Sequence, residues 1–198
     1  MMAGAGLCVA LLAAVIAGGC GGSTEPSVSA SDARGLARLR PVAPGWAWPA
    51  GTEKAAENGD TPSKDPLLAE FRQKTKGLTD LGESSGEWQD GDKLAHVDVA
   101  VYQSAADAHR AFAPFNELSL GWARRSGGFR GQHAVGGLGE EAWLLRQAQN
   151  GEQVTFHWRE ANLIIEAHMH CFGSCPSGLA GAARAWAERI DVRARALR

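Results

Sequence analysis

Two cysteines lie close together after the last apolar run, in the segment Cys171-Phe172-Gly173-Ser174-Cys175. In an exported protein such a pair most often forms a disulfide. The loop that it closes is short, so the bridge removes little chain entropy and should add on the order of 2 kcal/mol to stability. A redox function usually needs an exposed, low-pKa pair with two intervening residues rather than three. We therefore predict a structural disulfide between Cys171 and Cys175.

Three potential metal ligands precede these cysteines. Glu166, His168 and His170 alternate along a predicted strand, so their side chains should share one face. Imidazole and carboxylate groups, with the thiolate of Cys171 beside them, are ligands for zinc or copper. Their contiguous spacing differs from the recurring structural zinc patterns, and the solvent face of a half-buried strand is polar in any case. Solvation is the favoured interpretation, and the three residues remain candidate metal ligands.

Motifs for covalent catalysis or phosphate binding are absent from the sequence. There is no Gly-x-Ser-x-Gly nucleophile elbow. The string Gly137-Leu138-Gly139 lacks the lysine and hydroxyl positions that contact phosphate and metal, so it predicts a turn. Glu140 and Glu141 are adjacent, and neighbouring residues of a strand point to opposite faces. We predict no catalytic residues and no cofactor, with an envelope hydrolase or a metal-binding protein as the alternative function.

The N-terminus has the features of an export signal. An apolar run over 7–17 has the length of a signal-peptide core and is too short to span a bilayer. Small residues lead to a cysteine in Ala17-Gly18-Gly19-Cys20, and the stretch after it, rich in Gly, Ser and Pro, is typical of a flexible tether. The segment resembles the lipobox of bacterial lipoproteins, which implies cleavage before Cys20 and a lipid on its sulfur. An ordinary cleaved signal and an uncleaved anchor are the alternatives.

The rest of the chain has the size of one domain. The full chain of 198 residues contains 20 basic and 22 acidic ones, interspersed, for a net charge of −2. Such a surface has no field of one sign that would attract nucleic acid. We predict a signal peptide over 1–19, a lipid-anchored flexible linker over 20–44 and a single domain over 45–198. The expected location is the extracytoplasmic side of a cell membrane.

Three helices are predicted from caps and apolar spacing. Asp65-Pro66 supplies an N-cap and a proline suited to the first turn. Ser104 and Asp107 have the spacing of a capping box, and a helical apolar stripe follows them. Near the C-terminus, apolar residues at spacings of four, three and four indicate a helix that can lie across a sheet. This stripe comprises Leu179, Ala183, Trp186 and Ile190.

Strands are predicted from alternation and turn signals. Valines alternate with other side chains over 97–101, behind a turn signal at Asp90-Gly91-Asp92. A two-residue turn at Asn150-Gly151 would place Trp143 opposite Trp158. A second turn, centred on Glu160-Ala161, would place Trp158 opposite Leu163. Large apolar residues then share one face of three strands.

These elements predict an α+β fold, with a mostly antiparallel sheet of about five strands and helices packed on one face. In that arrangement Trp143, Trp158 and Trp186 meet at one interface between the sheet and the last helix. Core packing is the favoured role for them, and a ligand cleft is the alternative.

Three short segments resemble parts of uncharacterised secreted and lipid-anchored bacterial proteins. A strand leads into a Ser-Ala-x-x-Ala helix over 97–108, a Leu-Gly-Glu-Glu-Ala turn follows at 138–142, and an Arg-x-x-Asn turn links two strands at 159–162. The resemblance covers about 93–190 and implies a fold rather than a reaction. It implies a sensor or accessory domain at the cell envelope. We expect a membrane-anchored, non-enzymatic binding, sensor or accessory module whose partner is an envelope protein or a small ligand.

Overall fold

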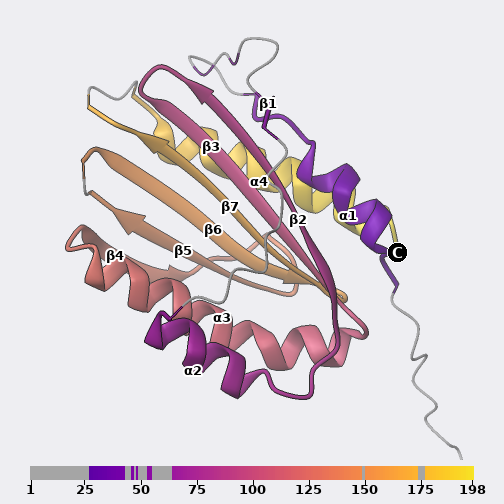
Figure 1. Ribbon diagram of the computed structural model, residues 1–198. Coiled ribbons are helices and arrows are strands. Elements are labelled where there is room, and N and C mark those ends of the chain that lie inside the picture. The colour runs from indigo at the N-terminus through magenta and orange to yellow at the C-terminus, as the bar shows by residue number, and fades with distance from the viewer. Residues whose placement is uncertain are drawn as a thin grey trace, which may run out of the picture.

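The computed structural model describes residues 27–42, 46, 48, 53–54, 64–148, 150–173 and 177–198, and these residues form four helices and one antiparallel sheet (Figure 1). The sheet order is β1-β2-β3-β7-β6-β5-β4. The helices are α1 (Ala30–Ala37), α2 (Pro66–Lys74), α3 (Ala105–Arg125) and α4 (Leu179–Arg195). The strands are β1 (Glu53–Lys54), β2 (Asp80–Asp90), β3 (Lys93–Tyr102), β4 (Phe129–Ala134), β5 (Glu141–Gln147), β6 (Glu152–Glu160) and β7 (Leu163–Cys171).

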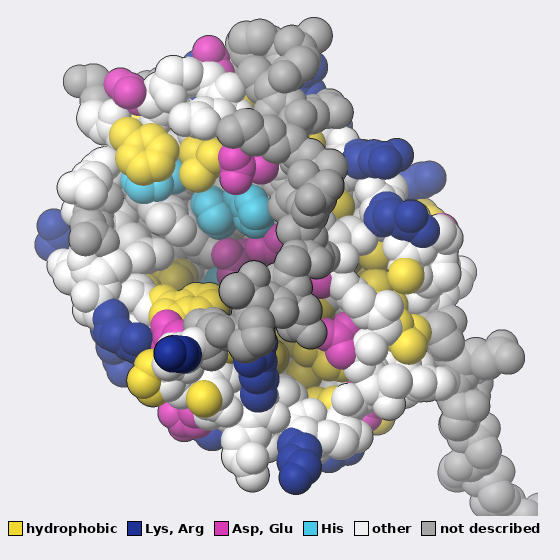
Figure 2. Space-filling view, in the orientation of Figure 1, with side chains coloured by type: hydrophobic (Ala, Val, Ile, Leu, Met, Phe, Trp, Pro, Cys, Tyr) yellow, Lys and Arg dark blue, Asp and Glu magenta, His cyan; other side chains and the backbone are white. Residues whose placement is uncertain are grey.

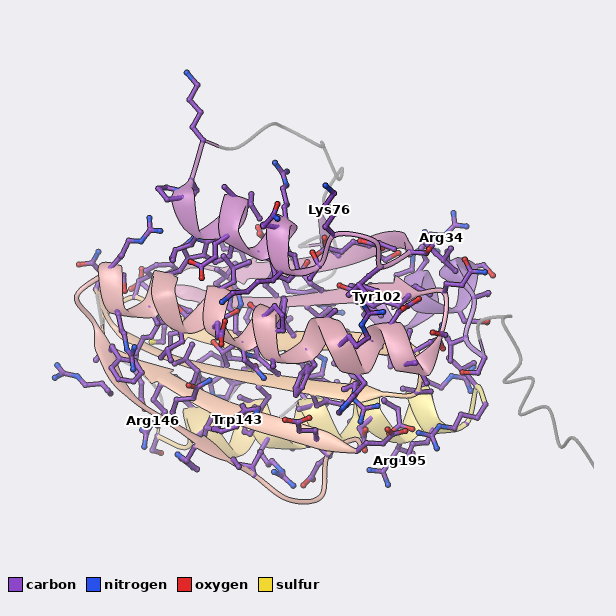
Figure 3. All side chains as sticks on the ribbon, turned by 90° about the horizontal axis from the view of Figure 1, so that it is seen from below. Arg34, Lys76, Tyr102, Trp143, Arg146 and Arg195 are labelled. Carbon is purple, nitrogen blue, oxygen red and sulfur yellow. The ribbon has the colours of Figure 1, made fainter. Side chains whose placement is uncertain are left out.

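The predicted α+β class and the antiparallel sheet are confirmed, with two differences. The described residues form six long strands rather than about five. The additional strand is β4, which was not predicted because a register shift at Gly131 interrupts its alternation. Helices also cover both faces of the sheet. Figure 3 shows α4 on one side and α3, with α2 packed on it, on the other. The expectation that the helices pack on one face of the sheet was wrong. Every residue of β6 from Val154 to Glu160 is buried, so this strand is covered on both sides.

The main core lies between the sheet and the helices α1 and α4. The predicted α4 stripe faces the sheet, and each of its four residues is at most 2% exposed. Trp186 of α4 packs edge-to-face against Trp88 of β2, with ring centroids 5.6 Å apart. Trp158 of β6 is fully buried in the same cluster. The predicted core roles of Trp158 and Trp186 are therefore confirmed.

Helix α1 lies within the segment predicted as a linker, 20–44. Ser29 caps it in a reciprocal capping box with Asp32. Leu36 is fully buried in the main core, so this part of the segment belongs to the domain. The helix approaches the sheet at Gly86, where an added Cβ would lie 2.0 Å from the carbonyl oxygen of Ala37. A short alanine-rich helix has few large apolar residues, and its periodicity was therefore missed.

The two predicted N-caps are confirmed. The side chain of Asp65 accepts a hydrogen bond from the Leu67 N–H and opens α2. The side chain of Ser104 accepts one from the Asp107 N–H and opens α3. Capping depends on residues that are neighbours in the chain, so it can be recognised without knowledge of the tertiary structure.

The hairpin between β5 and β6 has a different register from the predicted one. Gln147 pairs with Gln153, so Trp143 pairs with His157, and Ala142 pairs with Trp158. A slip of one residue moves a side chain to the opposite face of a strand. Trp143 consequently faces α3, and the expected meeting of Trp143 with Trp158 and Trp186 is wrong.

The next turn lies at 161–162 rather than at 160–161. Trp158 pairs with Ile165, whereas the prediction placed it opposite Leu163. This is a shift of two residues, and a shift of two keeps every side chain on its face. The core assignment of Trp158 survives for that reason.

Asn162 in this turn holds three chain segments together. Its Nδ2 donates to the carbonyl oxygens of Val28, at 3.0 Å, and Tyr102, at 2.9 Å. Its Oδ1 accepts from the Val28 N–H at 3.0 Å and from the Ser27 hydroxyl at 2.8 Å. Asn162 is 1% exposed, so one buried amide fixes the segment before α1 to the end of β3.

The turn before β5 packs against the hairpin formed by β6 and β7. Glu140 forms an ion pair with Arg159, and Asp191 of α4 accepts a hydrogen bond from the Gly139 N–H at 2.9 Å. Gly139 has φ +47°, and an added Cβ would lie 2.2 Å from the Arg159 carbonyl oxygen. The short motifs at 138–142 and 159–162 therefore have structural roles.

Candidate functional site

Polar side chains of three neighbouring strands gather on the face of the sheet opposite α4. The strand pairing places His96 of β3 opposite His168 of β7, and Glu166 of β7 opposite His157 of β6. His170 and Asp98 lie on the same face. Figure 2 shows histidine and acidic side chains together in a hollow of this face. We call His96, Asp98, His157, Glu166 and His168 the histidine–carboxylate cluster.

Glu166 is the centre of this cluster. Its Oε2 lies 3.0 Å from Nε2 of His157, and its Oε1 lies 3.4 Å from Nδ1 of His168. On the far side of the His157 ring, Nδ1 lies 3.1 Å from the side-chain oxygen of Asn116 in α3. Phe115 of α3 packs edge-to-face on the same ring, at 5.2 Å between centroids. His157 is 0% exposed and is held between the helix and the sheet.

The protonation of His157 decides which way the Asn116 amide must point. A neutral ring that donates from Nε2 to Glu166 needs a donor at Nδ1, so the amide must present its NH₂ group. A protonated ring donates from both nitrogens, and the amide must then present its oxygen. The two states of His157 therefore require opposite orientations of Asn116.

His96 forms the second half of the cluster. Its Nε2 lies 2.8 Å from Oδ2 of Asp98, and its Nδ1 lies 3.7 Å from Oε2 of Glu87 on β2. Its ring stacks on the ring of His168, with centroids 5.1 Å apart and an interplanar angle of 18°. This stack joins the β3 side of the cluster to the Glu166 side.

The pKa values of two members of the cluster, His96 and Glu166, are shifted. For His96, burial opposes the charged form, but the hydrogen bond and the charge of Asp98 outweigh it, and the pKa is raised above its ordinary value. For Glu166, burial favours the neutral acid, but the neighbouring His157 and His168 reverse this and hold the pKa well below its usual range. Both shifts favour the ionised pairs.

The three candidate metal ligands are only partly brought together. Glu166 and His168 are neighbours, but the ring of His170 packs on Phe172, with centroids 3.8 Å apart. Residues four positions apart on a strand are separated by about 13 Å, so Glu166 and His170 do not face a common point. Among the described residues, no group of three or more His, Cys, Asp or Glu side chains is arranged to hold a metal ion.

Several sequence predictions concern residues that the structure does not describe. The signal peptide over 1–19 and the lipidation site Cys20 precede the first described residue. Cys171 is buried at the end of β7, but Cys175 lies outside the described residues. The disulfide and the lipid therefore remain predictions. Among the helices that are described, none has both the length and the apolarity to cross a membrane.

A cleft lies between α3 and the edge of the sheet, beside the cluster. One stripe of α3 forms its helical wall, and Gln132 of β4 with Glu141 and Trp143 of β5 forms the other. The stripe consists of Ala113, Asn116, Glu117 and Leu120. The cleft has a volume of about 230 Å³ and a largely apolar lining. Trp143, labelled in Figure 3, is half-buried in its wall.

Asn116 belongs to both features. Its side chain lines the cleft and also contacts His157 in the histidine–carboxylate cluster. Sequence reasoning missed Asn116, His96 and His157, because it treated Glu166, His168 and His170 as a group within one strand. The available signal was the position of His96 between Ala95 and Val97 and of His157 between Phe156 and Trp158 in alternating strands.

Comparisons with known proteins give little further guidance. No protein-family model matches the chain, and no curated protein matches it. Among solved structures, the chain is similar to the extracellular domain of PknH from Mycobacterium tuberculosis, with 12% identity and a TM-score of 0.42. That likeness covers 83% of this chain and 92% of the other, and at this score it supports no argument about function.

Proposed function

We propose that the chain is a non-enzymatic binding or sensor module of the cell envelope, anchored by a lipid on Cys20, that binds a small ligand in the Trp143 cleft. The cleft is the observation that carries the proposal. An apolar concavity with a few convergent polar groups is the usual form of a small-molecule site. Here the indole of Trp143 and the side chain of Leu120 supply apolar surface, and Asn116 supplies a buried polar group.

The contacts of the cluster favour binding over catalysis. The imidazoles of His96, His157 and His168 are engaged by carboxylates or an amide. In nucleophilic catalysis one imidazole nitrogen instead contacts a hydroxyl or thiol that it activates. A cluster of this kind can hold the helical wall of the cleft in place through the contact of His157 with Asn116.

The volume of the cleft limits the ligand. Pockets for drug-sized molecules usually have about 300 to 1,000 Å³. At about 230 Å³, this cleft accommodates a small molecule or one side chain of a larger partner. The proposed location rests on the sequence of the first 20 residues, where small residues precede Cys20.

A fragment screen by saturation-transfer NMR tests the proposal. The wild-type domain should bind several small aromatic or aliphatic fragments, and Trp143→Ala should lose most of them because one cleft wall is removed. Trp122→Ala is the matched control, since Trp122 is an exposed tryptophan of α3 that does not line the cleft. Equal binding to both variants would place the ligand site elsewhere and refute the proposal.

A further inference from the structure

The polar lining of the Trp143 cleft has one sign of charge. Two carboxylates and two carboxamides line it, and the lining contains no Lys or Arg. Lys74 contacts one of the carboxylates, Glu117, and is shared between it and Glu70. Glu117 is therefore largely compensated by a cation of the protein itself.

Glu141 is in a different situation. Its Oε1 lies 3.5 Å from Nε1 of Trp143, a distance at the limit of a hydrogen bond. Across the described residues, no Lys or Arg lies within ion-pair distance of it. The carboxylate of Glu141 is thus an uncompensated negative charge at the edge of an indole ring.

From this arrangement we infer that the cleft selects a small organic cation, with an ammonium group near Glu141 and an apolar body against Trp143 and Leu120. The face of an indole ring attracts cations, and a carboxylate beside it adds to the attraction. An anionic ligand would meet Glu141 without a compensating positive group, and a neutral ligand would gain only the apolar contact. The inference deepens the proposed function and rests on it.

Asn116 adds a polar group at the helical wall. Its amide lines the cleft and also contacts His157, so the polar atom that faces the cleft is the one not bonded to that ring. The contact of 3.1 Å between Asn116 Oδ1 and Nδ1 of His157 holds this side chain in the helical wall.

Isothermal titration calorimetry with three related aromatic probes tests the inference. The probes are phenethylammonium, 2-phenylethanol and phenylacetate, which share an aromatic body and differ in charge. We expect phenethylammonium to bind about three to thirty times more tightly than the alcohol, as a cation–π contact of moderate strength gives, and phenylacetate to bind more weakly than either. Glu141→Gln should remove most of the preference for the cation and leave the affinity for the alcohol unchanged.

The control variant is Glu152→Gln, which removes an exposed carboxylate paired with Arg146 outside the cleft. It should keep the full preference for the cation. Equal or tighter binding of the alcohol or of phenylacetate would overturn the inference while leaving a ligand site in the cleft. Absence of binding for all three probes would also overturn it, and the fragment screen on Trp143→Ala then decides separately whether the cleft binds ligands.

Discussion

Replacing Asn162 with alanine should cost more stability than any surface substitution of this domain. Four hydrogen bonds of 2.8 to 3.0 Å are lost, and the backbone groups of Val28 and the carbonyl of Tyr102 lose their side-chain partner in a buried place. At about 1 kcal/mol for each bond, the expected loss is roughly 3 to 4 kcal/mol. For a domain of this size, that corresponds to a fall in Tm of about 10 °C.

Thermal unfolding followed by circular dichroism measures the loss. Asn116→Ala is the control, because Asn116 is a similarly buried amide whose described hydrogen bond is the one to His157, and it should cost about 1 kcal/mol. Limited proteolysis should also cut the Asn162→Ala variant first near α1, since the clamp on Val28 is gone. A Tm within about 2 °C of the wild type, or equal losses for the two variants, would refute the role assigned to Asn162.

Three further predictions follow from the cluster and the cysteines. Because the pKa of His96 is raised above 6.5, its ion pair stabilises the fold below that pH, and this contribution is lost as the pH rises through the folded-state pKa. Thermal unfolding between pH 6 and 8 should show falling stability that His96→Gln flattens, and an unchanged slope would contradict it. Non-reducing alkylation and mass spectrometry should find Cys171 bridged to Cys175, whereas two alkylated thiols would disprove the bridge. In a bacterial host, the full chain should fractionate with membranes and Cys20→Ala should not, and an unmodified Cys20 on a processed, soluble product would exclude lipidation.

The elements that local chemistry defines were predictable from the sequence. Asp65 and Ser104 cap helices through contacts within three residues, and the α4 stripe is visible as spacing alone. Helix α1 was missed despite the capping box of Ser29 and Asp32, because it has few large apolar residues and its burial depends on close approach to Gly86 of β2. No residue close to α1 in the sequence indicates the contact with Gly86.

The candidate site depended on the register and order of the strands. Trp143 reaches the cleft because β5 pairs with β6 one residue away from the predicted register, which moves its side chain to the α3 face. His96 meets His168 because β7 returns to pair with β3, and His157 meets Glu166 because β6 pairs with β7. These neighbours are far apart in sequence, so alternation could place each on a strand face without showing which residues it would contact.

The most direct test of ligand binding in the cleft is the side-chain NMR signal of Trp143. In a ¹H–¹⁵N spectrum the indole N–H of Trp143 can be assigned by its disappearance in Trp143→Phe. Titration with phenethylammonium should shift this signal in a saturable way, while the indole signal of the exposed Trp122 stays in place. A titration that shifts Trp122 but leaves Trp143 unchanged, or that shifts neither indole, would contradict ligand binding in the cleft.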